Sequence, residues 1–134
     1  MQRMFRRLAV VLALAPLLGL GATPTRADSL IGSYIAFIGQ DDLYNSQGKR
    51  LTAPWQVLRQ DRANFHRFGV SQPGDEWDPY FGVAANRATL ERMVRNGRID
   101  APAGKALLRG GVMVEVRIYG TGKVGRRVEV DVVR

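Results

Sequence analysis

Two runs near the C-terminus alternate between apolar and polar residues, and this pattern most limits the folds open to the chain. Residues 112–119 place valine or isoleucine at every second position, and residues 127–132 do the same with valine. A period of two is typical of a β-strand with one buried face, because successive side chains point to opposite sides of a sheet. The charged residues between the valines can then pair across the strands. The two runs therefore predict a hairpin whose inner face other elements must cover.

The stretch that joins these runs has the glycine spacing of a nucleotide-binding turn. Gly120, Gly122 and Gly125 follow the pattern G-x-G-x-x-G, which in dinucleotide-binding folds opens a helix whose N-terminus receives the pyrophosphate. The residues after Gly125 instead have the pattern of a strand. We therefore interpret the glycines as a hairpin connection that supplies positive φ angles, and we predict no cofactor.

The remaining segments complete a single α+β domain over residues 28–134. Residues rich in β-formers indicate a strand at 33–38. Asn45 and Gly48 favour a small hairpin or an ordered loop, because Asn45 can bond the backbone two residues on and Gly48 can take positive φ. We predict a small antiparallel sheet, made of the C-terminal hairpin and the N-terminal strand, packed with two or three helices.

Three helices are expected from apolar spacing and capping residues. They span residues 52–65, 86–96 and 100–109. Thr52 is the candidate N-cap of the first helix, whose last residue falls between 62 and 65, and Asp100 is the candidate N-cap of the third. Gly97 suits the left-handed position that commonly follows a helix.

The first residues have the features of an export signal. A positively charged start is followed by an apolar run at 8–20, and then by Thr25 and Ala27, small residues that fit the positions before a cleavage site. The apolar run has about 13 residues, fewer than the roughly 20 that a membrane-spanning helix needs. We predict a signal peptide at 1–27, cleaved after Ala27, and a periplasmic or secreted mature chain without a transmembrane segment. An early arginine pair leaves both the general secretory and the twin-arginine routes open.

Composition limits the chemistry of the predicted mature chain. It has no cysteine and one histidine, so thiolate chemistry is excluded and a zinc site would need carboxylates almost exclusively. Loss of four leader arginines lowers the net charge from +8 to about +4, with acids and bases interspersed. We expect an ordinary mixed surface, with weak contact to anionic envelope polymers as the alternative. Basic and aromatic residues do not interleave, so we predict no nucleic-acid partner.

The densest polar stretch, residues 59–69, contains the only histidine and the candidate catalytic residues. His66 lies five positions after Asp61, and a carboxylate that orients an imidazole can serve as a general base. No nucleophile in a recognised motif accompanies the pair, so we favour a structural role for both residues. A small cell-envelope hydrolase that uses His66 with Asp61 is the alternative.

Arg62 interrupts the apolar stripe that Trp55, Leu58 and Phe65 form on the first predicted helix. A charge on such a stripe must find a partner or extend to water. The neighbouring Asp61 should not face it, because adjacent helix positions point in different directions. We therefore predict an internal bridge between Arg62 and the acidic loop that follows the helix. The candidate partners are Asp41, Asp42, Asp75 and Asp78.

The acidic loop, residues 75–78, lacks the ligand spacing of a calcium-binding loop, so we predict no metal site. We expect a binding groove between this loop and the first helix, because recognition surfaces favour aromatic residues beside arginine. Its rim would contain Tyr44, Trp55, Trp77, Tyr80 and Phe81, although a place in the core suits Trp55 and Phe81 at least as well. The candidate binding residues are Arg62, Asp75, Trp77, Asp78 and Tyr80.

Two stretches of the chain read DLYNSQGKRL at 42–51 and VLRQDRANFHRFG at 57–69. They resemble small exported proteins of Gram-negative bacteria that have no assigned activity, and the likeness extends through 75–81 to the second helix. The resemblance implies export and a folded domain, and it transfers no functional residue. We therefore predict a non-enzymatic binding or interaction module, whose partner is an envelope protein or a small ligand.

Overall fold

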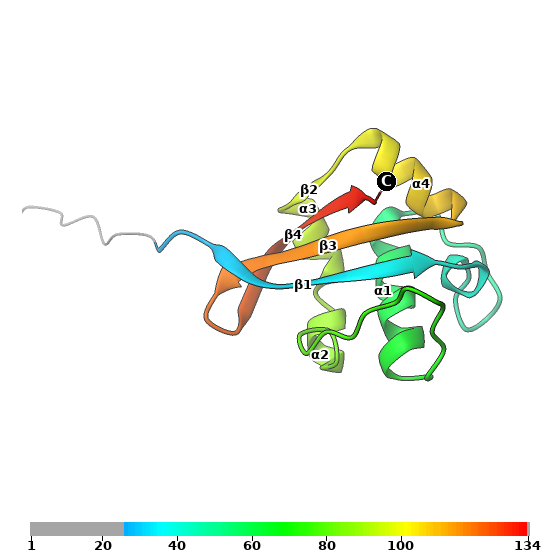
Figure 1. The fold of residues 1–134 in the computed structure, drawn as a ribbon, viewed down its shortest axis with the longest axis horizontal. Coiled ribbons are helices and arrows are strands. Elements are labelled where there is room, and N and C mark those ends of the chain that lie inside the picture. Colours follow the sequence, from blue (N-terminus) through cyan, green and yellow to red (C-terminus); the bar gives the residue numbers. More distant parts are fainter. Residues whose placement is uncertain (1–25, 134) are drawn as a thin grey trace, which may run out of the picture.

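The computed structural model describes residues 26–133, so all but the last two residues of the predicted leader at 1–27, and Arg134, lie outside the described residues. Figure 1 shows a sheet with α1 and α3 behind it. The elements in chain order are β1 (Ser29–Ile38), the 3₁₀ turn η1 (Gln40–Leu43), α1 (Pro54–His66), α2 (Ala84–Arg87), α3 (Leu90–Arg95), β2 (Arg98–Ile99), α4 (Ala101–Arg109), β3 (Val112–Thr121) and β4 (Val124–Val132). The predicted α+β class is confirmed.

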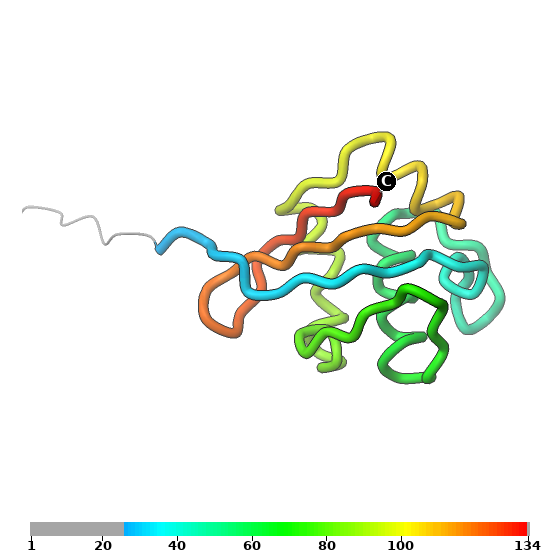
Figure 2. The backbone as a smooth tube through the Cα atoms, viewed as in Figure 1, coloured from blue at the N-terminus to red at the C-terminus, as the bar shows by residue number. Residues whose placement is uncertain are grey.

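The sheet is mixed and has the strand order β1-β3-β4-β2. β3 pairs antiparallel with both β1 and β4, so the predicted C-terminal hairpin forms the centre of the sheet and the predicted N-terminal strand lies at its edge beside β3. The two-residue strand β2 runs parallel to β4 and was not predicted, because two residues cannot display a period. Figure 2 shows that the start of β1 and the β3–β4 turn lie at the same end of the domain.

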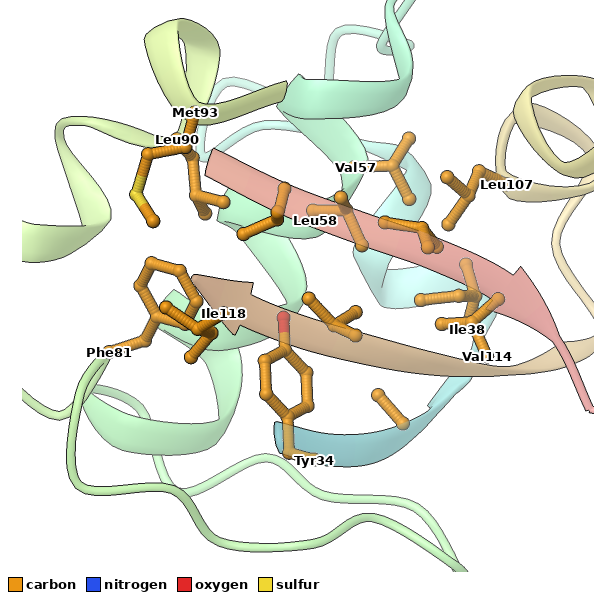
Figure 3. Packing of buried hydrophobic residues seen from close by; sticks show 14 of the residues in the cluster. Tyr34, Ile38, Val57, Leu58, Phe81, Leu90, Met93, Leu107, Val114 and Ile118 are labelled. Carbon is orange, nitrogen blue, oxygen red and sulfur yellow. The ribbon is translucent and has the colours of Figure 1, made fainter. Parts of the chain in front are cut away.

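The core lies between the inner face of the sheet and the helices (Figure 3). The alternating valines and isoleucines of the hairpin point into it, as their spacing predicts. Tyr34 stands on β1 with its ring in this cluster, and Phe81 meets it edge-on at 6.0 Å between ring centroids. The fully buried members from helices are Val57, Leu58, Leu90, Met93 and Leu107.

The acidic loop follows the free edge of β1. Asp75 accepts a hydrogen bond from Phe37 N at 2.7 Å, and Glu76 accepts one from Ile35 N at 2.9 Å. The backbone of Glu76 also donates to the Ile35 carbonyl. These bonds occupy strand groups that could otherwise pair with another chain. Two of the predicted loop acids therefore fasten the loop to the sheet.

Two expectations about the second helix are wrong. The predicted helix at 86–96 is replaced by two short ones, α2 and α3, with Ala88 and Thr89 between them, where the Thr89 hydroxyl donates to the Asn86 carbonyl at 2.7 Å. Gly97 does not take a left-handed conformation. A Cβ at Gly97 would instead overlap the carbonyl oxygen of Val128, so this glycine allows a close approach to β4.

The glycines that join β3 to β4 serve the hairpin, as predicted. Only Gly122 among them takes a positive φ, +62° in the turn, so the expectation of positive φ is wrong for Gly120 and Gly125, which lie within β3 and β4. Gly120 faces Gly125 across the strands, and a Cβ at Gly125 would overlap the hydroxyl of Tyr80. The Gly125 N–H donates to that hydroxyl at 3.0 Å. The strand β4 begins inside this stretch, where a dinucleotide-binding fold would begin a helix.

Candidate functional site

Arg62 lies at the centre of a buried ionic cluster on the inner side of α1, and its side chain is fully buried. Its Nη1 donates to Asp78 Oδ1 at 2.9 Å and to the Glu76 carbonyl at 3.0 Å. Its Cζ lies 4.0 Å from the ring centroid of Tyr34, where a cation is attracted to the ring face. The predicted bridge from the helix to the acidic loop is therefore confirmed, with Asp78 as the partner.

Asp61 belongs to the same cluster. Its Oδ2 accepts a hydrogen bond from Arg62 Nε at 2.7 Å. The expectation that these adjacent residues would not face each other is wrong, because the long arginine side chain folds back to the preceding carboxylate. Both side chains are buried, so the helix carries a guanidinium and a carboxyl group into the interior.

His66 bonds to Asp78, and no hydrogen bond joins it to Asp61 among residues 26–133. His66 Nε2 lies 3.0 Å from Asp78 Oδ1, and only 6% of the histidine side chain is exposed. Asp78 Oδ2 accepts from Phe81 N at 2.6 Å, so this carboxylate ties α1 to the chain that leads into α2. The structure thus does not assemble the His66–Asp61 pair of a hydrolase.

Burial dominates the electrostatics of Asp61. Removal from water raises the pKa of its carboxyl to about 7, while the Arg62 guanidinium acts in the opposite direction and Asp42 adds to the increase. For Arg62, burial alone would lower the pKa, but the surrounding groups, Asp61 and Asp78 among them, raise it above its ordinary value. The arginine therefore keeps its charge, while the charge of Asp61 changes near neutral pH.

Replacement of Asp61 by asparagine should flatten the pH dependence of stability. Because the folded state holds the Asp61 proton more tightly than the unfolded state, the stability due to this group is complete near pH 4 and declines as pH rises through 7. An asparagine side chain at this position would be neutral throughout and could still accept from Arg62 Nε. Between pH 4.5 and 8, we expect the variant to lose on the order of 2 kcal/mol less unfolding free energy than the parent.

Urea unfolding at several pH values measures this difference. His66, Asp42, Asp75 and Asp78 are present in both proteins, so the comparison isolates Asp61. Parallel curves for the two proteins would show that Asp61 stays ionised beside Arg62.

A second polar region lies on the exposed side of α1, against the loop at 44–51. A hollow of about 290 Å³ is lined there by Asn45, Ser46, Gln47, Leu51, Trp55, Gln56, Arg59 and Gln60. A neighbouring hollow of about 580 Å³ shares Asn45, Ser46 and Gln60 and extends to Tyr44 and Phe68. We call the two hollows together the amide groove. Their volumes fall near the roughly 300–1,000 Å³ of small-molecule sites.

The local sequence explains the loop that forms one wall of the amide groove. Asn45 Oδ1 accepts from Gln47 N at 3.0 Å and from Lys49 N at 2.9 Å, and Gly48 has φ of +74°. Tyr44 and Arg50 pair across the loop base as an isolated bridge. The predicted small hairpin and the roles of Asn45 and Gly48 are confirmed.

The five aromatic residues expected on one rim lie in different places. Tyr44 and Trp55 line the amide groove. Phe81 is fully buried in the core, while the Trp77 side chain is 67% exposed. Tyr80 lines a separate hollow with Ile31 and Val83. Among the other binding candidates, Arg62 and Asp78 are buried, and Asp75 bonds to β1.

Sequence reasoning missed the groove amides Asn45, Gln56 and Gln60 as a set. Gln56 and Gln60 lie four positions apart and therefore share one helix face, which is a usable signal. Their meeting with Asn45 depends on how the loop folds back onto α1, and no spacing encodes that contact.

The described residues contain neither a metal-binding cluster nor a helix that could span a membrane. Within 26–133, no three histidine, cysteine, aspartate or glutamate side chains gather where they could hold a metal ion. None of the helices described is long and apolar enough to span a bilayer. Comparison of the chain with protein-family models, with curated proteins and with solved structures finds no match.

Proposed function

We propose that this chain is an exported, non-enzymatic binding module of the cell envelope and that the amide groove is its ligand site. The export part rests on the leader features of the first 27 residues. The two stretches that resemble small exported proteins, 42–51 and 57–69, supply most of the groove.

The observation that carries the binding function is the contrast between the two sides of α1. On the inner side, the reactive groups bond to one another and are buried, as Asp61, Arg62 and His66 show. On the outer side, amides and an indole line an open hollow. Small-molecule sites place a few fixed polar groups beside apolar side chains in a concave surface, and the amide groove places its amides beside Leu51 and Trp55.

A binding module should respond to ligand at the groove without converting the ligand. We would titrate the isotopically labelled protein with the glycan, peptide and lipid fractions of a bacterial envelope and follow its amide and indole signals by NMR. We expect one fraction to shift the signals of Trp55, Gln60 and the loop at 44–51, while the signals of the buried cluster stay in place. Shifts confined to other surfaces, or chemical turnover of a fraction, would contradict the proposal.

A further inference from the structure

The geometry of the amide groove points to a saccharide as its ligand, an inference that rests on the proposed binding function. A pyranose carries neighbouring hydroxyl groups around its edge and C–H groups on its faces. A site for it needs fixed donors and acceptors beside an apolar flat surface. The groove supplies both kinds of contact from side chains that the fold already holds in place.

The acceptor of the groove is anchored through a chain of hydrogen bonds that leads from the groove into the interior. Gln60 Nε2 donates to Asn64 Oδ1 at 2.9 Å, and Asn64 Nδ2 donates to Asp42 Oδ1 at 2.8 Å. Asp42 in turn accepts from Gly39 N at 2.8 Å. Asn64 and Asp42 are buried. Because the Gln60 nitrogen is committed to this chain, its Oε1 is oriented and left to accept from a ligand.

The donors of the groove are two amide nitrogens, each held in place because the carbonyl oxygen of the same amide accepts hydrogen bonds from the backbone. Asn45 Oδ1 receives two backbone N–H groups of its own loop. Gln56 Oε1 receives Thr52 N at 3.0 Å and Ala53 N at 3.1 Å, which also closes the start of α1. Neither Asn45 Nδ2 nor Gln56 Nε2 takes part in these bonds, so each amide nitrogen is left as a donor.

Together these groups suit a diol. A hydroxyl both donates and accepts, so one hydroxyl can accept from an Asn45 or Gln56 nitrogen while it or its neighbour donates to Gln60 Oε1. Trp55 lines the same hollow and offers an indole against which the C–H face of a sugar ring can lie. Because one half of each amide is already bonded, ordering these side chains costs little on binding.

Two other ligand classes fit less well. An extended peptide that adds to a sheet needs a free strand edge, and Asp75 and Glu76 occupy that edge of β1. A polyphosphate favours several converging cations, whereas Arg59 is the single cation among the residues that line the smaller hollow. Arg59 is exposed and can pair with the carboxylate of an acidic sugar at the rim.

The test is calorimetric titration of the purified protein with three probes: chitotriose, cellotriose and trigalacturonate. We expect at least one probe to bind, and the same probe to shift the NMR signal of the Trp55 indole. Trp55→Ala should then weaken binding by roughly tenfold or more, because truncated tryptophans give the largest losses at binding sites. Trp77→Ala is the matched control, since Trp77 is exposed and belongs to the loop beside β1. It should leave the affinity unchanged.

A second variant tests the groove independently, in case Trp55→Ala does not fold. Ser46 is exposed and lines both hollows, so Ser46→Trp should block the groove while the melting temperature stays at the parental value. Retained saccharide binding in Ser46→Trp, or equal losses in Trp55→Ala and Trp77→Ala, would overturn the saccharide site. If no probe binds but a peptide or lipid fraction shifts the groove signals, the saccharide inference fails and the proposed function stands. If no fraction shifts them, both fail.

Discussion

Replacement of Arg62 by methionine lowers the free energy of unfolding at pH 7 by about 3–5 kcal/mol, the range found when one partner of a buried ion pair is removed. Methionine fills much of the arginine volume, so the loss comes from charge and hydrogen bonding. Asp61 and Asp78 would lose a common cation that lies 2.7 Å and 2.9 Å from their oxygens. Both carboxylates are buried, so neither can regain water without opening the interior.

The matched control is Arg95→Met. Arg95 also pairs with a carboxylate, that of Glu91 at 2.9 Å, but the arginine side chain is 71% exposed. Exposed pairs four positions apart on a helix contribute about 0.5 kcal/mol or less, so this variant should unfold almost as the parent does. Denaturant unfolding at constant pH compares the two.

A double variant separates the charge effect from packing. If carboxyl groups left without their cation cause the loss in Arg62→Met, adding Asp61→Asn should restore about 1–2 kcal/mol, because the cost of burying the Asp61 carboxyl is then gone. An Arg62→Met protein as stable as Arg95→Met would show that the cluster adds nothing to folding. No recovery in the double variant would place the loss in packing instead.

The strands, and the N-cap of α4, could be predicted because their signals are local. The expected N-cap Thr52 is wrong, because α1 begins one residue later with Ala53 as its N-cap and Thr52 N donates to Gln56 Oε1. The alternation at 112–118 needs only neighbouring residues, and the inner side chains of β3 are buried as it requires. Asp100 accepts from Ala103 N at 2.8 Å, as its position before a helix predicts. The loop at Asn45 is equally local, since its bonds span two to four residues.

The parts that sequence alone did not reveal depend on contacts between distant segments. The apolar stripe of α1 predicts that Arg62 needs a partner, yet four acids fit the sequence and only the path of the loop selects Asp78. Asp42, another of those four, bonds to Asn64 and so supports the amide groove instead. His66 pairs with Asp78 across 12 positions rather than with the nearer Asp61. Sequence proximity therefore identified the polar residues but not their partners.

The replacement of Gly97 by alanine tests a long-range constraint of another kind, the close approach of this backbone segment to β4. The chain passes from α3 to β2 at this residue, and a Cβ there would overlap the Val128 carbonyl oxygen and lie 2.9 Å from the Met93 carbonyl oxygen. Both obstacles are backbone atoms, so no side chain can turn away to make room. We expect Gly97→Ala to destabilise the domain by about 3 kcal/mol, at the upper end of ordinary overpacking, measured by denaturant unfolding.

Gly104→Ala is the matched control and should act in the opposite direction. Gly104 lies inside α4, and the nearest neighbour of an added Cβ is a side-chain carbon of Pro54 at 3.5 Å, an ordinary contact. Alanine favours a helix over glycine by up to about 1 kcal/mol, so this variant should be slightly more stable than the parent. Because the two substitutions add the same methyl group, opposite signs would locate the Gly97 effect in its approach to β4. A Gly97→Ala protein that matched Gly104→Ala would mean that α3 and β4 can separate freely, and the close approach would not be needed for the fold.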